Sequence, residues 1–467
     1  MKFERLNPLT QEVASVAPGM TASEARLVAD RAAAAFPVGA ALGPNGRRAS
    51  LMRAAEALEA RKDALVEAMM TESGATVGWA MFNLTLAAGM VREAAALVTQ
   101  VSGEVIPSDK PGCVALALRE PAGVVLGIAP WNAPIILAVR AIAVPLACGN
   151  AVILKASEIC PHTHGLVIEA FQEAGFPPNT VNLVTNAPPD VGDVVGALID
   201  HPAVRRINFT GSTAVGRVVA RRATEQLKPC LLELGGKAPL IVLEDADLDE
   251  AVKAAAFGAF LNQGQICMST ERIIVVAAVA AEFNRRFAAK AKSLLAGDPR
   301  VGKTPLGALV DTRAIARVNA LIDDAVAKGA SVIAGGKGDG ILMNATVVDR
   351  VTPAMKLYHE ESFGPVVALI HASDEPDAVR LANDSEYGLS AAVFTRDSAA
   401  GCGWRARSAR AYAKSTGPPF TTRPSCRLVV RALPVTGGSA AGPASNNLLS
   451  CVGSPSKHAP ANSRSES

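Results

Sequence analysis

From Gly123 onward, short apolar segments alternate with amphipathic segments of helical spacing. Strands separated by helices of about 10–15 residues form right-handed βαβ units, in which the strands lie parallel in one sheet. The predicted strands are 123–130, 151–155, 180–184 and 206–211, and the predicted helices are 134–147, 161–174, 189–199 and 213–226.

The alternation restarts after residues 228–243, which indicates two parallel-sheet α/β domains with a boundary near residue 230. We predict a first domain over 1–230 and a second over 231–400. The Ala-rich segment 21–100 predicts two or three further helices. The second domain is predicted to contain helices 247–260, 279–295, 311–328 and 375–383, and strands 272–276, 331–334, 366–371 and 390–395.

Composition limits the function classes of this chain of 467 residues. A net charge of +3 argues against a dedicated nucleic-acid binder. No apolar run reaches the length of about 18 residues that a membrane span needs. The first residues, MKFERLNPLT, lack the apolar centre of a signal peptide, so we expect a cytoplasmic protein.

Residues 401–467 differ in composition from the rest of the chain. They contain nine Lys and Arg residues but a single acidic residue, Glu466, and they are rich in Ser, Pro and Gly. Polar segments of this kind are commonly disordered. We therefore predict a boundary near Gly401 and a disordered segment after it.

Several predicted strands end in residues suited to binding a ligand. In open α/β sheets, ligands bind beyond the carboxyl ends of the strands and beside helix N-termini. Residues 130–132 (PWN), Lys155 with Glu158, residues 210–213 (TGST) and Glu233 all occupy such positions. The sequence GSTAVG at 211–216 lacks the Lys-Ser/Thr pair of a nucleoside triphosphatase loop. It is compatible either with a pyrophosphate site or with an ordinary Ser helix cap.

Cys267 is a candidate nucleophile because small and polar residues surround it in NQGQICMST. A lone Cys is more often a buried apolar residue, and a Glu such as Glu233 is more often at the surface or in an ion pair. His162 and His164 flank a predicted helix start. Six scattered His residues give little reason to expect a metal site, and we predict none.

Six segments together resemble the NAD(P)-dependent aldehyde dehydrogenase superfamily. They occur in the family's order and spacing over about residues 20–397: PWN, ILKASE, FTGSTAVG, LELGGK, NQGQIC and EESFGPV. The resemblance implies two Rossmann-like domains, an NAD-binding domain over 1–230 and a catalytic domain over 231–400. It also implies an oligomerisation arm over 108–122. The region 103–150 is most similar to bacterial salicylaldehyde, benzaldehyde and vanillin dehydrogenases.

The resemblance implies a role for each matched residue. Cys267 is the expected nucleophile, Asn132 the expected oxyanion donor and Glu233 the expected base that activates water. A carboxylate at Glu158 is expected to favour NAD over NADP, because it repels a 2′-phosphate. The expected cofactor-binding residues are Trp131, Lys155, Ser157, Glu158, Gly211, Ser212, Gly235, Glu361 and Phe363.

These roles predict NAD-dependent oxidation of an aromatic aldehyde through a thiohemiacetal and a thioester on Cys267. A semialdehyde or aliphatic aldehyde dehydrogenase is the alternative within the class, and an anionic semialdehyde would require Arg or Lys in the substrate tunnel. An alternative of another class is an NAD-binding protein whose altered C-terminal segment impairs catalysis.

The family pattern stops after SAAVFTRD at 390–397, before the usual C-terminal oligomerisation strand. Codons for residues 411–423 can be chosen so that a frame shifted by one nucleotide gives Gly-Ile-Cys-Lys-Ile-Asn-Gly-Pro-Pro-Val-His-Asp-Glu, as the family has there. We therefore predict a frameshift near codon 400; the alternative is a natural basic, disordered tail. Family members are expected to form homo-oligomers, and the altered segment leaves the oligomeric state of this chain open.

Overall fold

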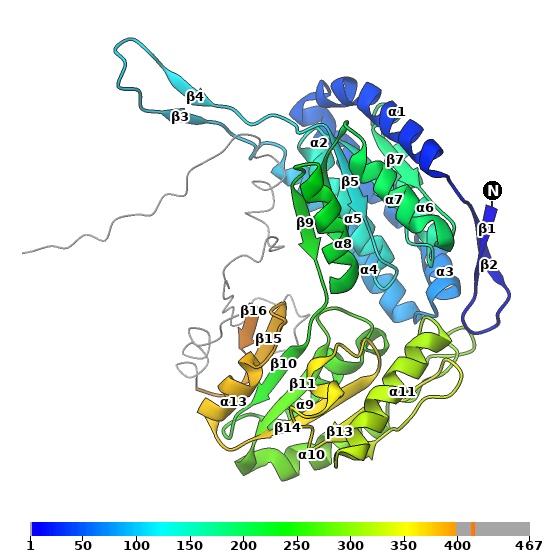
Figure 1. The fold of residues 1–467 in the computed structure, drawn as a ribbon, viewed down its shortest axis with the longest axis vertical. Helices are drawn as coiled ribbons and strands as arrows, with labels where there is room; N and C mark the ends of the chain where they lie inside the picture. The colour runs from blue at the N-terminus through cyan, green and yellow to red at the C-terminus, as the bar shows by residue number, and fades with distance from the viewer. Residues whose placement is uncertain (1, 398–411, 416–467) are drawn as a thin grey trace, which may run out of the picture.

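Two largely parallel sheets organise the computed structural model, which describes residues 2–397 and 412–415 (Figure 1). The first sheet is entirely parallel, with strand order β7-β6-β5-β8-β9. Its strands β5 and β6 are buried along their whole length, as expected for a sheet with helices on both faces. The strands are β5 (Val124–Ile128), β6 (Ala151–Lys155), β7 (Val181–Val184), β8 (Val204–Thr210) and β9 (Cys230–Glu233).

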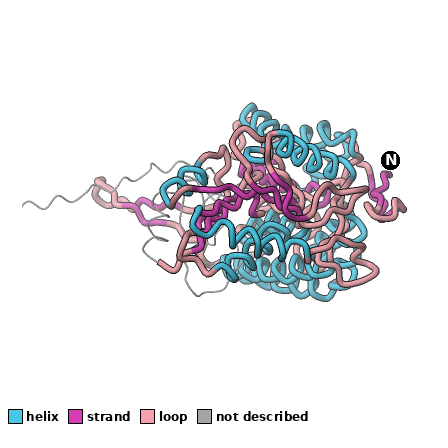
Figure 2. Tube along the Cα trace, turned by 90° about the horizontal axis from the view of Figure 1, so that it is seen from below, coloured by secondary structure: helices cyan, strands magenta, loops and turns pink. Residues whose placement is uncertain are grey.

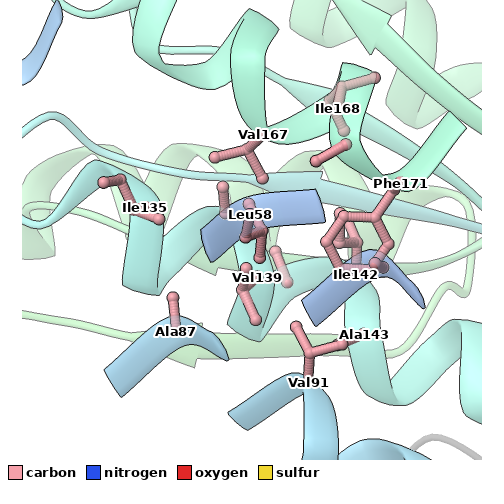
Figure 3. Close-up of a cluster of buried hydrophobic side chains, with 14 of the residues drawn as sticks. Leu58, Ala87, Val91, Ile135, Val139, Ile142, Ala143, Val167, Ile168 and Phe171 are labelled. Carbon is pink, nitrogen blue, oxygen red and sulfur yellow. The ribbon is translucent and has the colours of Figure 1, made fainter. Parts of the chain in front are cut away.

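Helices from two parts of the chain cover this first sheet. The crossover helices are α5 (Pro134–Ala147), α6 (Pro161–Gln172), α7 (Val191–Asp200), which follows the 3-10 turn η1 (Pro188–Asp190), and α8 (Thr213–Glu225). The N-terminal segment adds α1 (Ala22–Ala40), α2 (Gly43–Ala60), α3 (Lys62–Ser73) and α4 (Val77–Leu97). Leu58, Val139, Ile142 and Phe171 from three of these helices meet in one buried cluster (Figure 3).

The second sheet has the order β12-β13-β14-β11-β10-β15-β16, and only β12 runs antiparallel to its neighbour. Its strands are β10 (Ala238–Val242), β11 (Thr270–Val276), β12 (Ser331–Ala334), β13 (Thr346–Asp349), β14 (Val366–Ala372), β15 (Ser390–Phe394) and β16 (Tyr412–Ser415). The helices are α9 (Leu248–Phe260) with the 3-10 turn η2 (Leu261–Gly264), α10 (Ala277–Lys292), α11 (Thr312–Ala327), α12 (Lys356–His359) and α13 (Glu375–Asn383).

The segment after residue 400 was predicted to be disordered, and the structure describes four of its residues. Tyr412–Ser415 form β16, which pairs in parallel with β15 from Ser390 to Val393 at the edge of the second sheet. The edge of β15 offers free backbone groups that a further strand can pair with. The remaining residues of 401–467, the predicted frameshift and the C-terminal oligomerisation strand lie outside the described residues.

A short N-terminal hairpin joins the two domains. Strands β1 (Lys2–Leu6) and β2 (Val13–Pro18) pair with each other in antiparallel fashion. From β1, Arg5 donates through Nε to the carbonyl oxygen of Glu72 at 2.8 Å and through Nη2 to that of Val310 at 3.2 Å. We call these two contacts the Arg5 bridge, since Glu72 belongs to the first domain and Val310 to the second.

A second hairpin extends away from the body of the molecule (Figures 1 and 2). It consists of β3 (Glu104–Ile106) and β4 (Ala115–Ala117), paired in antiparallel fashion. The predicted arm at 108–122 therefore begins too late, because the hairpin starts with β3. Its apolar side chains are largely in solvent: Val105, Ile106, Val114, Leu116 and Leu118.

The predicted elements from Gly123 onward are confirmed with small shifts at their ends, but other predictions were less accurate. The N-terminal segment holds four helices instead of two or three, because the Ala-rich pattern runs through the breaks near Leu42, Arg61 and Gly74. The boundary predicted at 230/231 falls inside β9, and the chain crosses between the sheets at 234–237. No helix in the described part of the chain is long and apolar enough to cross a membrane.

The buried cluster of Figure 3 leads to a stability prediction. Ile142 is fully buried between α5 and its neighbours, so Ile142→Ala should lower the free energy of unfolding by about 2–5 kcal/mol. Equilibrium urea denaturation followed by circular dichroism measures this loss. Leu27→Ala, on the solvent side of α1, should change it by at most about 0.5 kcal/mol. Equal losses in the two variants would contradict the assignment of this cluster as the core.

Candidate active site

A cleft of about 360 Å³ is lined by residues of both domains. The first domain contributes residues after β5, β8 and β9, and the second contributes the segment after η2, the start of α11 and the turn before β14. Nine of the twelve predicted site residues line this cleft: Trp131, Asn132, Gly211, Ser212, Glu233, Gly235, Cys267, Glu361 and Phe363.

Cys267 follows a turn with unusual backbone geometry. Asn262 and Gln263 have positive φ angles of 49° and 56°, and Gly264 follows at 70°. Such a conformation costs about 1–3 kcal/mol at a non-Gly residue, so it persists only where other contacts compensate. Here the side chain of Gln263 donates to the carbonyl oxygen of Ala308 at 2.9 Å. The turn thereby directs the chain so that the partly exposed Cys267 reaches the cleft.

Asn132 is held by three hydrogen bonds from different parts of the chain. The backbone carbonyl oxygen of Asn132 accepts from the indole N–H of Trp79 at 2.9 Å and from the side-chain amide of Asn262 at 3.1 Å. The side-chain amide nitrogen of Asn132 donates to the backbone carbonyl oxygen of Gln265 at 2.8 Å. An amide NH₂ carries two donor hydrogens, so one remains for a ligand in the cleft. The buried Asn132 side chain is therefore a fixed donor beside Cys267.

Glu233 forms an ion pair with Arg140 of α5, and both side chains are largely buried. Burial raises the pKa of the Glu233 carboxyl, and the nearby guanidinium opposes that shift. Glu233 is therefore ion-paired, and its carboxyl still has a raised pKa. A carboxylate with a raised pKa is suited to accept a proton near neutral pH.

Cys267 itself is protonated near neutral pH in the free protein. Burial raises the pKa of its thiol to about 11, the Arg140 guanidinium opposes the shift, and the carboxylates of Glu361 and Glu233 add to it. Only the thiolate is an effective nucleophile, so the attacking form is scarce until the surroundings of the sulfur change.

Glu361 and Phe363, from the turn before β14, line the cleft together with Trp131. The ring of Phe363 packs edge-on against that of Trp131, with 5.8 Å between the centroids and 80° between the planes. Glu361 accepts a hydrogen bond from the backbone N–H of Gly236 at 3.1 Å. A side chain at Gly235 would displace the Glu361 carboxylate from this position. Burial raises the pKa of Glu361 to about 7, and neighbouring Glu271 adds to the shift.

Three predicted residues do not line the cleft but follow β6, the neighbour of β5 in the sheet. Lys155 is buried and forms an ion pair with Glu158, which also accepts from the side-chain amide of Asn186 at 3.1 Å. The backbone N–H of Ser157 donates to Nδ1 of His164 at 3.1 Å. His164 is thus a buried partner of this turn, and burial lowers its pKa to about 3.

Ser212 is a helix cap, as one of the two interpretations of the GSTAVG segment predicts, and it also borders the cleft. Its hydroxyl accepts from the backbone N–H of Val215 at 3.3 Å, which makes it the N-cap of α8. Gly211 and Ser212 also line the cleft, so the N-terminus of α8 borders it. A helix N-terminus favours anions through its free N–H groups and its dipole.

Comparisons with known proteins agree with this geometry. The model of the aldehyde dehydrogenase family matches residues 1–409. The chain belongs to the aldehyde dehydrogenase family. It is 56% identical over 395 residues to a vanillin dehydrogenase of Pseudomonas fluorescens, covering 85% of this chain and 82% of that protein.

Two solved structures of family members are similar along most of their length. One is a salicylaldehyde dehydrogenase from Pseudomonas putida G7 complexed with salicylaldehyde, with 44% identity, a TM-score of 0.89 and coverage of 91% of this chain and 88% of that chain. The other is an NAD-dependent benzaldehyde dehydrogenase from Corynebacterium glutamicum, with 36% identity, a TM-score of 0.85 and coverage of 90% of each chain.

The sequence did not reveal several residues that shape this aldehyde dehydrogenase cleft. Arg140 carried a signal, because it is the one charged residue in the apolar helix PIILAVRAIAVPLA. Arg317 lines the cleft and donates to the carbonyl oxygen of Ser362 at 2.8 Å, whereas the sequence around it resembles an ordinary amphipathic helix. Trp79 is 53 residues from its partner Asn132, so no local pattern connects them.

The high pKa of Cys267 predicts how the free enzyme reacts with iodoacetamide. The thiolate fraction, and with it the alkylation rate of Cys267, should rise about tenfold per pH unit from pH 7 to pH 10. Mass spectrometry of the Cys267 peptide measures the rate, and the exposed Cys113 provides an internal reference. A rate that levels off below pH 9 would contradict the burial described above.

Proposed function

We propose that this aldehyde dehydrogenase oxidises aromatic aldehydes to carboxylic acids, with NAD as the hydride acceptor. The observation that carries the proposal is the convergence of Cys267, Asn132 and Glu233 in one cleft. A thiol, an amide donor and a carboxylate with a raised pKa are the groups needed to form and hydrolyse an acyl-enzyme.

In the proposed reaction the Cys267 thiol first gives its proton to water, and the thiolate sulfur then attacks the aldehyde carbonyl carbon to form the oxyanion of a thiohemiacetal. The free hydrogen of the Asn132 amide and the backbone N–H of Cys267 stabilise the oxyanion, and losing one such donor typically lowers the rate about 100- to 1,000-fold. Loss of hydride leaves a thioester on Cys267. Glu233 then takes a proton from water, which attacks the thioester, releases the carboxylic acid and frees Cys267.

The residues around the cleft fit a dinucleotide. The N-terminus of α8 at Ser212 offers N–H groups to a pyrophosphate, and Glu158 at the end of β6 offers a carboxylate to ribose hydroxyls. Glu361 lines the cleft and accepts from the N–H of Gly236, and it can accept from a second ribose. Bound NAD would supply the hydride acceptor, and the negative Glu158 favours it over NADP by repelling a 2′-phosphate.

The named relatives support an aromatic substrate, and two aromatic side chains of α4 lie next to Asn132, outside the residues that line the cleft. Trp79 and Phe82 stack with 5.4 Å between their ring centroids, and the Trp79 indole donates directly to Asn132. Aromatic rings favour contact with other rings in stacked or edge-on arrangements. The relatives named for vanillin, salicylaldehyde and benzaldehyde agree with this substrate class.

An anionic semialdehyde is disfavoured because the guanidinium groups near the cleft already have partners. Arg140 pairs with Glu233, Arg313 pairs with Asp311, and Arg317 donates to the carbonyl oxygen of Ser362. A carboxylate substrate would have to displace one of these interactions. Arg313 is also largely in solvent, where an ion pair with substrate contributes little.

We further propose that the β3–β4 hairpin mediates self-association. Its exposed side chains Val105, Val114, Leu116 and Leu118 form an apolar surface on a segment that extends from the body. Exposed apolar surface of this kind typically marks an interface. A second copy of the chain is the partner that the family resemblance implies.

The substrate proposal predicts the order of activities. With NAD, the formation of NADH from vanillin, salicylaldehyde or benzaldehyde should exceed that from succinate semialdehyde and short aliphatic aldehydes by at least about tenfold in kcat/KM. Replacing NAD by NADP should lower activity because of Glu158. A preference for succinate semialdehyde would contradict the aromatic assignment, and NAD binding without any turnover would favour the alternative of a catalytically impaired protein.

If Glu233 is the base that activates water, Glu233→Gln should slow thioester hydrolysis without slowing the first formation of NADH. Gln cannot take a proton from water, so the thioester should accumulate and steady-state turnover should fall about 100- to 10,000-fold. A rapid burst of NADH of about one equivalent per active site should remain, and stopped-flow absorbance measures it. Cys267→Ala is the control, because it should show neither burst nor turnover.

A further inference from the structure

Glu271 is a buried carboxylate of β11 that the proposed reaction does not use. It accepts from the backbone N–H of Ser362 at 2.8 Å and from that of Phe363 at 3.1 Å. It also pairs with the ammonium group of Lys237 at 2.5 Å. A buried charge is stable only when it is paired and hydrogen-bonded, and Glu271 meets both conditions through one turn and one side chain.

The turn that Glu271 holds contains the predicted cofactor residues. Phe363 has a φ of 49°, a conformation that costs free energy in a residue with a bulky side chain. The N–H groups of the turn go to Glu271, while the carbonyl oxygen of Ser362 accepts from Arg317 at 2.8 Å. The backbone next to Glu361 is thus fixed from two opposite sides.

Lys237 connects this turn to the other segment that holds Glu361. It follows Gly235 and Gly236, and the N–H of Gly236 donates to the Glu361 carboxylate at 3.1 Å. The Lys237 side chain is fully buried. The ion pair between Lys237 and Glu271 therefore sets the distance between Gly235–Gly236 and the turn at Ser362 and Phe363. Gly236 donates to the Glu361 carboxylate, and Glu361 itself precedes this turn.

We propose that Glu271, together with Lys237, is a positioning residue for cofactor binding that holds Glu361 in the geometry needed to bind the nicotinamide ribose. The inference rests on the proposed function, since it assigns Glu361 to that ribose.

The neighbouring residue Arg272 binds a different part of the structure. It donates to the carbonyl oxygens of Leu381, Ala382 and Asp384 at the end of α13 and does not contact the turn.

The charge of Glu271 also affects Glu361 directly. Glu361 must be ionised to accept from two ribose hydroxyls, and burial and Glu271 raise its pKa to about 7. NAD affinity should therefore be full above that pKa and fall as the pH drops through it. The titratable and charged groups around Glu361 are Lys237 at the start of β10, Glu271 on β11, Arg317 on α11, Cys267 after η2, and Tyr387 before β15.

The test measures NAD binding by isothermal titration calorimetry from pH 6 to pH 9. In Glu271→Gln, the Kd for NAD should rise about tenfold at pH 9, because the turn is held less firmly. The pH midpoint of binding should also move about one unit lower, because a negative neighbour is gone. A role limited to stability would leave the Kd of the folded variant at pH 9 unchanged.

A second variant addresses folding. Glu271→Gln leaves Lys237 buried without its carboxylate, so we pair it with Lys237→Met to remove both charges. The double variant should show the same rise in Kd at pH 9 as the single one. Its midpoint should move less, because the Lys237 charge that lowers the pKa of Glu361 is also gone. Circular dichroism checks that each variant is folded at the assay temperature.

Asp245→Asn is the matched control. Asp245 also accepts from two backbone N–H groups and one hydroxyl, those of Arg396, Asp397 and Thr395, but it does not line the cleft. Its variant should bind NAD like the wild type at every pH. If Asp245→Asn and Glu271→Gln alter binding equally, the effect is a general loss of rigidity and the proposal is overturned.

Glu361→Gln separates this inference from the proposed function. It should weaken NAD binding and remove the midpoint near pH 7. If Glu361→Gln binds NAD as the wild type does, the proposed ribose contact itself is wrong. If it changes binding as expected while folded Glu271→Gln and the double variant do not, only the inference about Glu271 is overturned. Failure of both Glu271 variants to fold would likewise overturn it in favour of a purely structural role.

Discussion

Parallel strands that end at a common edge determine where the functional groups of this protein lie. Asn132 and Ser212 follow strands β5 and β8, and Glu233 is the last residue of β9, so one sheet brings three separate segments to the same side. Only residues 234–237 then separate β9 from β10, the first strand of the second sheet. That short crossing brings Cys267 and Glu361 of the second domain opposite the first, without any long flexible connection to absorb misalignment.

Around the cleft, strained backbone is compensated by contacts from distant segments. The positive φ angles of Asn262 and Gln263 are stabilised by hydrogen bonds to Asn132 and Ala308, and that of Phe363 by Glu271. Each of these partners lies more than 40 residues away along the chain. The local geometry therefore depends on the completed fold, and the cleft cannot form from any one segment alone.

The sequence predicted features that depend on local patterns and missed those that depend on distant contacts. Helix 134–147, strand 151–155 and helix 375–383 were predicted with the bounds that the structure has, because apolar period and Pro or Asp near the helix starts define them locally. The residues of the cleft came from six family motifs. The Arg140–Glu233 pair joins α5 to β9, and strands β1 and β2 pair only with each other near the N-terminus, so neither left a periodic pattern to find.

The Arg5 bridge has a consequence for recombining this protein with its relatives. Both acceptors of Arg5 are backbone carbonyl oxygens, those of Glu72 and Val310. A backbone oxygen is present whatever side chain occupies the position. A chimera with its first domain from this chain and its second from a relative therefore keeps this connection as long as Arg5 is retained and the backbone near Val310 is conserved. The joint between the domains therefore tolerates sequence exchange on the side that carries Cys267.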